Sequence, residues 1–185
     1  MNRRDFLRVS LLGSGALVMG VSFPGCAGPD QRRMEEAVAS SGAFKPNAYI
    51  TITPENRVRV GIGKSEMGQG VMTHHAMLVA EELNVELDRV DAYHAEAGPE
   101  FQLFGLQQTG GSSSVRETYE PFRRAAATAR AMLVAAAAET WECPVGECVA
   151  REGAVHHRPS EESLTYGQLA EAAASQSIPK KVTLK

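Results

Sequence analysis

Residues 49–83 read YITITPENRVRVGIGKSEMGQGVMTHHAMLVAEEL. The first part alternates apolar with small or polar residues on either side of Pro54-Glu55-Asn56, which predicts a β-hairpin with strands at 49–53 and 58–62. Apolar residues then recur at helical spacing through Leu83, so a helix follows, with Asn84 as its expected C-cap. A glycine-bracketed turn, Met67-Gly68-Gln69-Gly70, joins the second strand to this helix.

A second glycine segment, Gly110-Gly111-Ser112-Ser113-Ser114, precedes another helical pattern. That helix is predicted to begin at Ser113 or Ser114, either of which would serve as its N-cap, and Pro121 kinks it or marks a second helical start. The first N–H groups of a helix lack internal partners, so we expect bare N–H groups and serine hydroxyls here to bind an anionic ligand. For each segment taken alone, a plain glycine turn or a flexible linker stays an alternative.

The rest of the chain continues to alternate between strands and helices. A strand is predicted at 91–95, a hairpin at 147–157 turning at Glu152-Gly153, and a helix at 166–174 capped by Thr165. The intervening loop, 98–112, is long enough to suggest a functional or partner-covered segment. The predicted order, β-β-α-β-α-β-β-α, describes an α+β fold whose small sheet has edges and a face that need cover.

Composition places the chain among folded globular proteins. Of its 185 residues, 43% are hydrophobic and 22% are charged, which are ordinary values for a domain. The net charge of −3 argues against nucleic acid as a partner, because tracking a phosphate backbone needs a basic surface. We expect residues 46–175 to form the domain and residues 176–185 to form a tail that leads into a further part of a longer protein.

The first 27 residues have the features of an export signal. Basic residues, including the pair Arg3-Arg4, precede an apolar stretch at 9–21 that is short for a membrane span, and Gly25-Cys26-Ala27 supplies small residues for cleavage. The arginine pair indicates the twin-arginine route, so we expect a periplasmic protein or one held at the periplasmic side of the inner membrane. Cleavage, retention as an anchor, and a chance arginine pair before a buried helix are the alternatives. Residues 28–45 are predicted to form a linker.

Several other residues resemble parts of known functional motifs, but no ligand-binding or catalytic role is predicted for them. Gly63-Lys64-Ser65 lacks the upstream glycine of a phosphate-binding loop, because Val58 stands at that position. The adjacent pairs His74-His75 and His156-His157 point to different faces, so neither predicts a metal site. Glu81 and Glu82 are expected on the solvated side of their helix. No residue is assigned a catalytic role.

Two cysteines, Cys143 and Cys148, leave two alternatives open. They close a small disulfide loop in an oxidising compartment, or they remain as two unpaired thiols. No cysteine or histidine lies at a zinc-like spacing from them, so no metal site is predicted.

Four motifs together resemble the molybdenum-cofactor-binding subunit of the xanthine dehydrogenase/aldehyde oxidase family. They are Lys64-Ser65-Glu66-Met67-Gly68-Gln69-Gly70, Ala80-Glu81-Glu82-Leu83, Thr109-Gly110-Gly111-Ser112-Ser113-Ser114-Val115-Arg116 and Tyr119-Glu120-Pro121. The likeness runs through residues 44–185. With the twin-arginine start, it is greatest for the branch of isoquinoline 1-oxidoreductase β subunits and periplasmic aldehyde dehydrogenases.

The resemblance implies a molybdenum hydroxylase or dehydrogenase that acts on N-heteroaromatic compounds or aldehydes, with water as the oxygen source. It implies that the two glycine segments hold molybdopterin cytosine dinucleotide. The implied contacts are Gly68, Gln69, Gly70, Gly111, Ser112, Ser113, Ser114 and Val115. The implied partners are a small [2Fe-2S] subunit, the remainder of the large subunit and a cytochrome as electron acceptor.

The family's large subunits are several times longer than this chain. Their general-base glutamate lies near their C-terminus, outside the region that this chain resembles. We therefore expect the chain to be the N-terminal cofactor-binding segment of such a subunit and to be inactive by itself. The alternative is a stand-alone, non-catalytic remnant that binds a cofactor or a protein and needs a separately encoded partner.

Overall fold

The structure is a computed structural model that describes residues 7–12, 16–21, 48–98, 101 and 107–185. Five strands form one sheet in chain order, and neighbours are antiparallel except for the parallel pair β4 and β5. These strands are β1 (Leu7–Leu12), β2 (Ala16–Val21), β3 (Ala48–Ile52), β4 (Val58–Ile62) and β5 (Val90–His94). A parallel pair needs a crossover connection, which the helix α2 (Val71–Leu83) supplies, with the 3₁₀ turn η2 (Leu87–Arg89) before β5.

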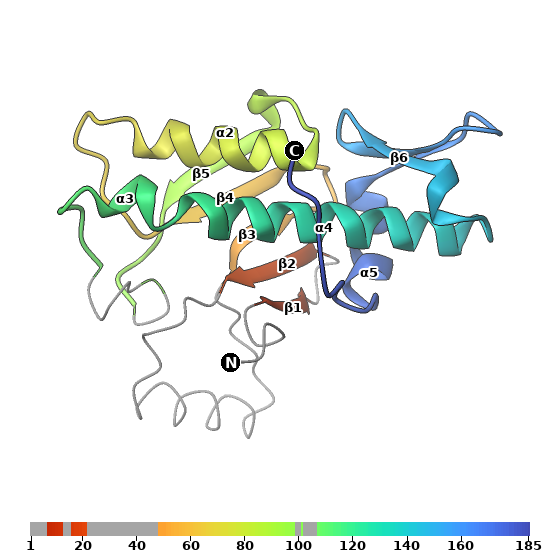
Figure 1. The fold of residues 1–185 in the computed structure, drawn as a ribbon, viewed down its shortest axis with the longest axis horizontal. Coiled ribbons are helices and arrows are strands. Elements are labelled where there is room, and N and C mark those ends of the chain that lie inside the picture. The colour runs from red at the N-terminus through yellow and green to blue at the C-terminus, as the bar shows by residue number, and fades with distance from the viewer. Residues whose placement is uncertain (1–6, 13–15, 22–47, 99–100, 102–106) are drawn as a thin grey trace, which may run out of the picture.

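Two helices cover one face of this sheet (Figure 1). The helix α4 (Tyr119–Thr140) lies beside α2, and the short helix α3 (Ser113–Arg116) precedes it. The buried side of α4 is mostly alanine, with Ala125, Ala129 and Ala136 all at 0% exposure. Small side chains let the helices approach one another and the sheet closely. The large core residues come from both layers, with Ile50 and Ile62 from the strands and Phe122 from α4.

A second, three-stranded sheet lies beside the C-terminal half of α4 (Figure 1). It contains β6 (Cys148–Arg151), β7 (Ala154–His157) and β8 (Ser163–Thr165), and the turn η4 (Val145–Glu147) leads into it. The helix α5 (Tyr166–Ala174) follows β8. The Tyr166 hydroxyl is buried and donates to the Leu83 carbonyl over 2.5 Å, which ties α5 to the end of α2.

The α+β class and most elements expected from the sequence are confirmed. The hairpins at β3–β4 and β6–β7 form, Asn84 ends α2 in the left-handed conformation, and Thr165 caps α5 in a capping box with Gln168. Two details differ. β1, β2 and β8 were not predicted as strands, and the N-cap position of α3 belongs to Ser112, which makes no side-chain cap bond. Pro121 lies in the first turn of α4, so the second helical start is the correct alternative.

The N-terminal segment is described only in part. Its apolar stretch contributes β1 and β2 to the sheet, whereas Arg3, Arg4, residues 25–27 and the proposed linker 28–45 lie outside the described residues. The export signal therefore stays a prediction. Among the helices that the structure describes, none is both long and apolar enough to cross a membrane.

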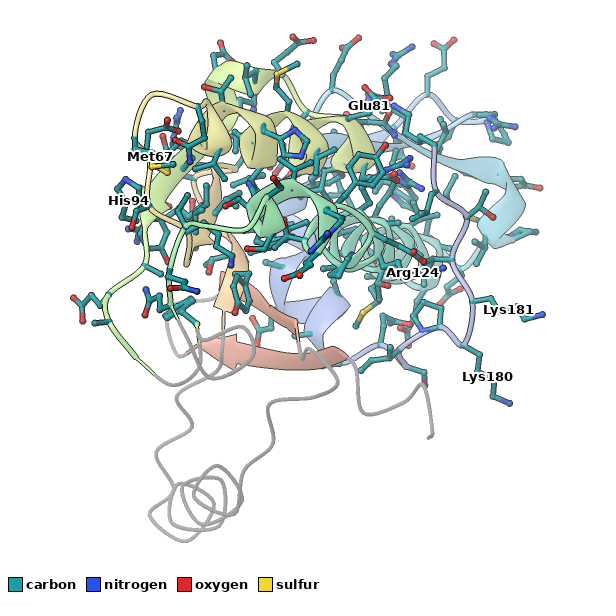
Figure 2. All side chains as sticks on the ribbon, turned by 60° about the vertical axis from the view of Figure 1, so that its left-hand side comes forward. Met67, Glu81, His94, Arg124, Lys180 and Lys181 are labelled. Carbon is teal, nitrogen blue, oxygen red and sulfur yellow. The ribbon has the colours of Figure 1, made fainter. Side chains whose placement is uncertain are left out.

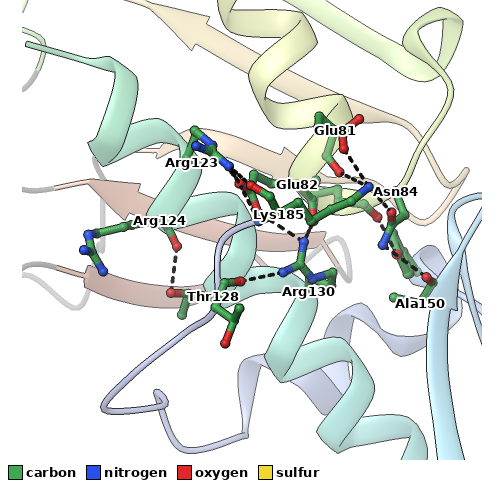
Figure 3. Close-up of polar contacts among 12 residues, drawn as sticks. Glu81, Glu82, Asn84, Arg123, Arg124, Thr128, Arg130, Ala150 and Lys185 are labelled. Atoms are coloured by element: carbon green, nitrogen blue, oxygen red, sulfur yellow. Dashed lines mark hydrogen bonds and ion pairs between the residues drawn. The ribbon is translucent and has the colours of Figure 1, made fainter. Parts of the chain in front are cut away.

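Glu82 corrects the expectation that it lies on the solvated side of its helix. Its side chain is fully buried between two arginines of α4, as Figure 3 shows. Arg123 Nη2 lies 2.7 Å from Glu82 Oε1 and Arg130 Nη1 lies 3.2 Å from Glu82 Oε2. Both arginines also donate to main-chain carbonyls of the C-terminal residues, Arg130 to Thr183 and Arg123 to Lys185. This ion cluster joins α2, α4 and the C-terminal segment.

We predict that Glu82→Ala lowers the free energy of unfolding by about 3 kcal/mol, because it leaves two arginines in a largely buried position without their carboxylate. The neighbouring Glu81→Gln is the matched control, since the Glu81 side chain is 64% exposed. Urea denaturation of both variants is the measurement. Equal destabilisation by the two substitutions would contradict the role given to Glu82.

Candidate functional site

The two glycine segments, far apart in the sequence, lie side by side at the N-terminal ends of α2 and α3. The Thr109 hydroxyl donates to the Ser65 carbonyl over 2.8 Å. The Lys64 ammonium donates to the Gln108 carbonyl at 3.1 Å and to the Ser113 hydroxyl at 3.2 Å. We call residues 65–70 and 109–115 together the glycine edge. The two motifs thus meet in one surface of the structure.

Lys64 is the buried centre of this arrangement. Only 6% of the residue is exposed, and burial lowers the pKa of its ammonium, an effect that the charge of Glu117 opposes. A buried charge is tolerated when it is hydrogen-bonded. Here one acceptor, Ser113, belongs to the second glycine segment, and the other, Gln108, directly precedes it. The end of β4 therefore places a cation directly beneath the glycine edge.

The glycine edge exposes main chain rather than side chains. Gly70 has φ 81° and Gly111 has φ 58°, a region that side-chain-bearing residues enter only with strain. No described atom lies within 4 Å of the position that a Cβ would take at either residue. Met67, beside them, is 73% exposed and projects from the same edge of the molecule as His94 (Figure 2). A flat ligand can therefore rest against this backbone.

The N–H groups of the first segment are not bare, and this corrects the sequence-based expectation. The Glu66 carboxylate accepts from the N–H groups of Gly68 and Gly70 at 2.9 Å and from that of Met72 at 3.0 Å. These bonds lower the pKa of Glu66 and keep it ionised. The Glu66 carboxylate is thus the anion that stabilises the N-terminal end of α2.

Gln69 is also folded onto its own turn. Its side-chain carbonyl accepts from the Met67 N–H at 2.7 Å, and its amide donates to the Ser65 carbonyl at 2.9 Å. The side chain therefore shapes the turn in this structure. Its assignment as a cofactor contact remains a prediction.

The second segment divides into exposed and inward-facing residues. Ser112 and Val115 are exposed, whereas Ser114 is buried at 8% exposure. The Ser113 hydroxyl donates to the Gly110 carbonyl at 2.9 Å and accepts from Lys64. Gly111, Ser112 and Val115 are thus exposed to a ligand, Ser113 is half-buried and Ser114 is buried.

Sequence reasoning missed His94, which borders the glycine edge. A shallow groove runs beside the edge, and its lining includes Lys64, Ser65, His94 and Gln107. In the parallel pairing of β4 and β5, His94 lies opposite Ile62, just before the glycine turn. Parallel strands end at the same edge of a sheet. The end of β5 could therefore have been placed beside the end of β4 from the sequence, and His94 is the last residue of β5.

His75 joins α2 to the start of α4 beneath the glycine edge. Its Nδ1 lies 2.8 Å from the Val71 carbonyl and its Nε2 lies 2.7 Å from the Thr118 hydroxyl. Burial lowers its pKa from 6.5 to about 4, so the ring is neutral at pH 7. A carbonyl only accepts, so the neutral ring carries its proton on Nδ1 and donates it to Val71. The Thr118 hydroxyl, which lies against Nε2, donates to the Ser114 carbonyl at 2.5 Å. This agrees with the expectation of a packing histidine.

We predict that the chain loses stability as the pH falls from 6.5 toward 4. The unfolded state takes up a proton at His75 in that range and the folded state does not, because its pKa is lowered to about 4. The loss at pH 5 should be about 2 kcal/mol relative to pH 7. Urea denaturation at both pH values tests this. In His75→Gln the pH dependence should shrink, and an unchanged dependence in that variant would contradict the assignment.

The fold and the glycine edge together define a cofactor-binding domain of the α+β class. The family model described as a molybdopterin cofactor-binding domain matches residues 14–185. The chain therefore belongs to the molybdopterin cofactor-binding domain family, whose members are parts of molybdenum hydroxylases and dehydrogenases.

Relatives of known function agree with this assignment. Isoquinoline 1-oxidoreductase subunit beta from Brevundimonas diminuta is 32% identical over 97% of this chain and 22% of its own length. The membrane-bound aldehyde dehydrogenase [pyrroloquinoline-quinone] of Gluconacetobacter polyoxogenes is 33% identical over 72% of this chain and 17% of its own. The chain thus spans about a fifth of these relatives.

Solved structures show the same fold. CO dehydrogenase from Oligotropha carboxidovorans has 26% sequence identity and a TM-score of 0.54, over 66% of this chain and 15% of its own. Quinoline 2-oxidoreductase from Pseudomonas putida 86 has 20% identity and a TM-score of 0.52, over 72% of this chain and 17% of its own, which is evidence of the fold alone.

Proposed function

We propose that this chain is the cofactor-binding segment of a larger molybdenum hydroxylase or dehydrogenase and that it holds molybdopterin cytosine dinucleotide at the glycine edge. The observation that carries the proposal is the meeting of the two glycine segments above Lys64, in a chain of the molybdopterin-binding family. When bound, such a cofactor supplies the oxygen-transfer chemistry and accepts the electrons.

The charges around the glycine edge favour binding of the pterin and of the phosphates at different segments. The Glu66 carboxylate already occupies the N–H groups at the start of α2, and its charge opposes a phosphate there. The exposed backbone of Gly68 and Gly70 therefore suits the uncharged pterin. The phosphates are better placed near Gly111, Ser112 and Ser113, where the Lys64 ammonium lies 3.2 Å from the Ser113 hydroxyl.

Activity, substrates and partners belong to the whole protein of which the chain would be a part. The names of the relatives support oxidation of an N-heteroaromatic compound or an aldehyde. On the same footing we propose a separate [2Fe-2S] subunit and a cytochrome as the electron-transfer partners. The base that would act on the substrate is expected outside residues 1–185.

Cofactor binding is tested by substituting a glycine of the edge. In the native full-length subunit we expect Gly111→Ala to lose most bound molybdenum and nucleotide, because the φ of 58° strains any side chain and the new Cβ lies on the binding face. The strain costs about 1–2 kcal/mol, so the variant still folds. Metal analysis and chromatography of the acid-released nucleotide are the measurements.

Gly146→Ala, in η4 at the other end of α4, is the matched control and should retain the cofactor. Full retention by Gly111→Ala would contradict the proposed site. A wild-type protein without molybdenum or cytidine nucleotide would contradict the proposed function and favour the cofactor-free remnant.

We also propose export by the twin-arginine route, supported by Arg3 and Arg4 in the sequence. The double substitution Arg3→Lys/Arg4→Lys should leave the protein in the cytoplasm while folding is unchanged. Cell fractionation with immunodetection is the measurement, and substitution of Arg32 and Arg33 is the control. Equal export of both double variants would contradict this route.

A further inference from the structure

A second cluster of potential ligands lies at the opposite end of α4 from the glycine edge (Figure 1). Cys143 follows α4, Glu147 lies in η4 and His157 ends β7. One ligand atom from each of these three residues lies within 4.8 Å of the other two. No metal site was predicted here from spacing along the sequence, but the β6–β7 hairpin pairs Cys148 with His157 and so brings a histidine close to Cys143.

Hydrogen bonding fixes the orientation of the His157 ring. Its Nδ1 lies 2.7 Å from the Ser160 hydroxyl, and that hydroxyl donates to the Glu162 carboxylate over 3.1 Å. The single hydroxyl proton is thus directed to Glu162, so Ser160 accepts a proton from Nδ1. The Nε2 lone pair is left facing the cluster. A ring oriented through a hydrogen-bonded Nδ1, with Nε2 facing the other ligands, is the usual arrangement of a metal-binding histidine.

The Nε2 lone pair faces another electron-rich atom. Glu147 Oε2 lies 3.2 Å from it, so a cation is needed between the two groups. A proton would be enough for the nitrogen and the oxygen. The Cys143 sulfur, however, lies within 4.8 Å of both atoms and is a third potential metal ligand. With metal–ligand bonds of about 2.0–2.2 Å, two ligands of a tetrahedral ion are about 3.3–3.6 Å apart. The nitrogen–oxygen distance of 3.2 Å is slightly shorter, so a small separation of the two side chains admits the ion.

We propose that Cys143, Glu147 and His157 form a Zn²⁺ site with a fourth position open to solvent. Thiolate, imidazole and carboxylate are the ligands that Zn²⁺ takes in proteins. The exposed fraction is 13% for the His157 side chain and 43% for that of Glu147, so the ion has an entry path. The stack of Trp141 on His157, with ring centroids 5.6 Å apart, holds the histidine in place.

Binding here joins the end of α4 to the second sheet. Cys143 is anchored to α4 by its N–H bond to the Ala138 carbonyl at 3.0 Å, and Glu147 accepts at its main-chain carbonyl from the Arg158 N–H at 3.0 Å. The bound ion closes the gap between these anchored segments. It therefore raises the melting temperature of the chain and acts independently of the molybdenum cofactor.

Cys148 is a neighbour with a competing reaction. Its sulfur lies 3.6 Å from that of Cys143, and within the described residues both cysteines are free thiols. A two-electron oxidant would join them and remove the Cys143 ligand, so binding is tested under reducing conditions. Cys148→Ser removes this reaction and keeps the three proposed ligands.

The test uses the metal-free 185-residue chain with a phosphine reductant. Zn²⁺ affinity is measured by competition with a chromophoric chelator, and Co²⁺ is added in a parallel experiment to detect thiolate-to-cobalt charge transfer. We expect one ion per chain, a charge-transfer band and a higher melting temperature. Cys143→Ser should remove the band, whereas Cys148→Ser should keep both the band and the affinity.

His157→Gln and Glu147→Gln should each weaken Zn²⁺ binding at least about tenfold. Glu147 is the more accessible of the two, so its substitution remains informative if the histidine variant fails to fold. The absence of a charge-transfer band in the wild-type chain would overturn the proposal. So would a band that survives Cys143→Ser, because the thiolate would then come from elsewhere.

Discussion

The buried Lys64 ammonium is the constraint on which the candidate site depends. Lys64 follows β4, and its two hydrogen-bond acceptors lie more than forty residues later in the chain. Burying an ammonium without hydrogen-bond acceptors costs folding free energy, so these bonds hold the second glycine segment beside Lys64. The fold contributes the other half of the geometry, because the β4–α2–β5 crossover and the α3–α4 junction bring both helix starts to the same edge.

The same edge shows how the chain stabilises a helix start that is also part of a candidate site. Glu66 bonds three N–H groups there. The exposed glycine backbone can then accept an uncharged group while the cationic side of the edge accepts phosphates. Further from the edge, Glu82 and its two arginines hold α2 on α4, so the positions of the two helices are fixed by charge as well as by packing.

Local patterns predicted much of the fold. The turn residues predicted the positions of the hairpins. Asn84 and Thr165 predicted the ends of helices correctly, because the left-handed backbone of Asn84 and the capping side chain of Thr165 act on residues close to them in the chain. The site was predicted only as two separate motifs. That Lys64 joins them, and that Glu66 occupies the N–H groups, depends on contacts that spacing along the chain does not reveal.

The errors have the same physical origin. Glu82 was expected to be exposed to solvent because it follows another glutamate on a helix. Two arginines from α4 pair with its carboxylate and compensate the cost of burying it. His157 was not grouped with Cys143 because no histidine lies at a zinc-like spacing from the cysteines in the sequence. The register of the β6–β7 hairpin, which was predicted, would have placed it opposite Cys148. The pairing of β6 with β7 thus brings together residues that are separated along the chain.

The central claim is that both glycine segments form one cofactor-binding surface. Hydrogen–deuterium exchange, compared between the molybdenum-loaded full-length protein and the same protein stripped of cofactor, tests it most directly. The account predicts that the amide hydrogens of residues 67–72 and 110–115 gain protection together when the cofactor is bound. Protection confined to one segment, or found only elsewhere in the chain, would contradict it.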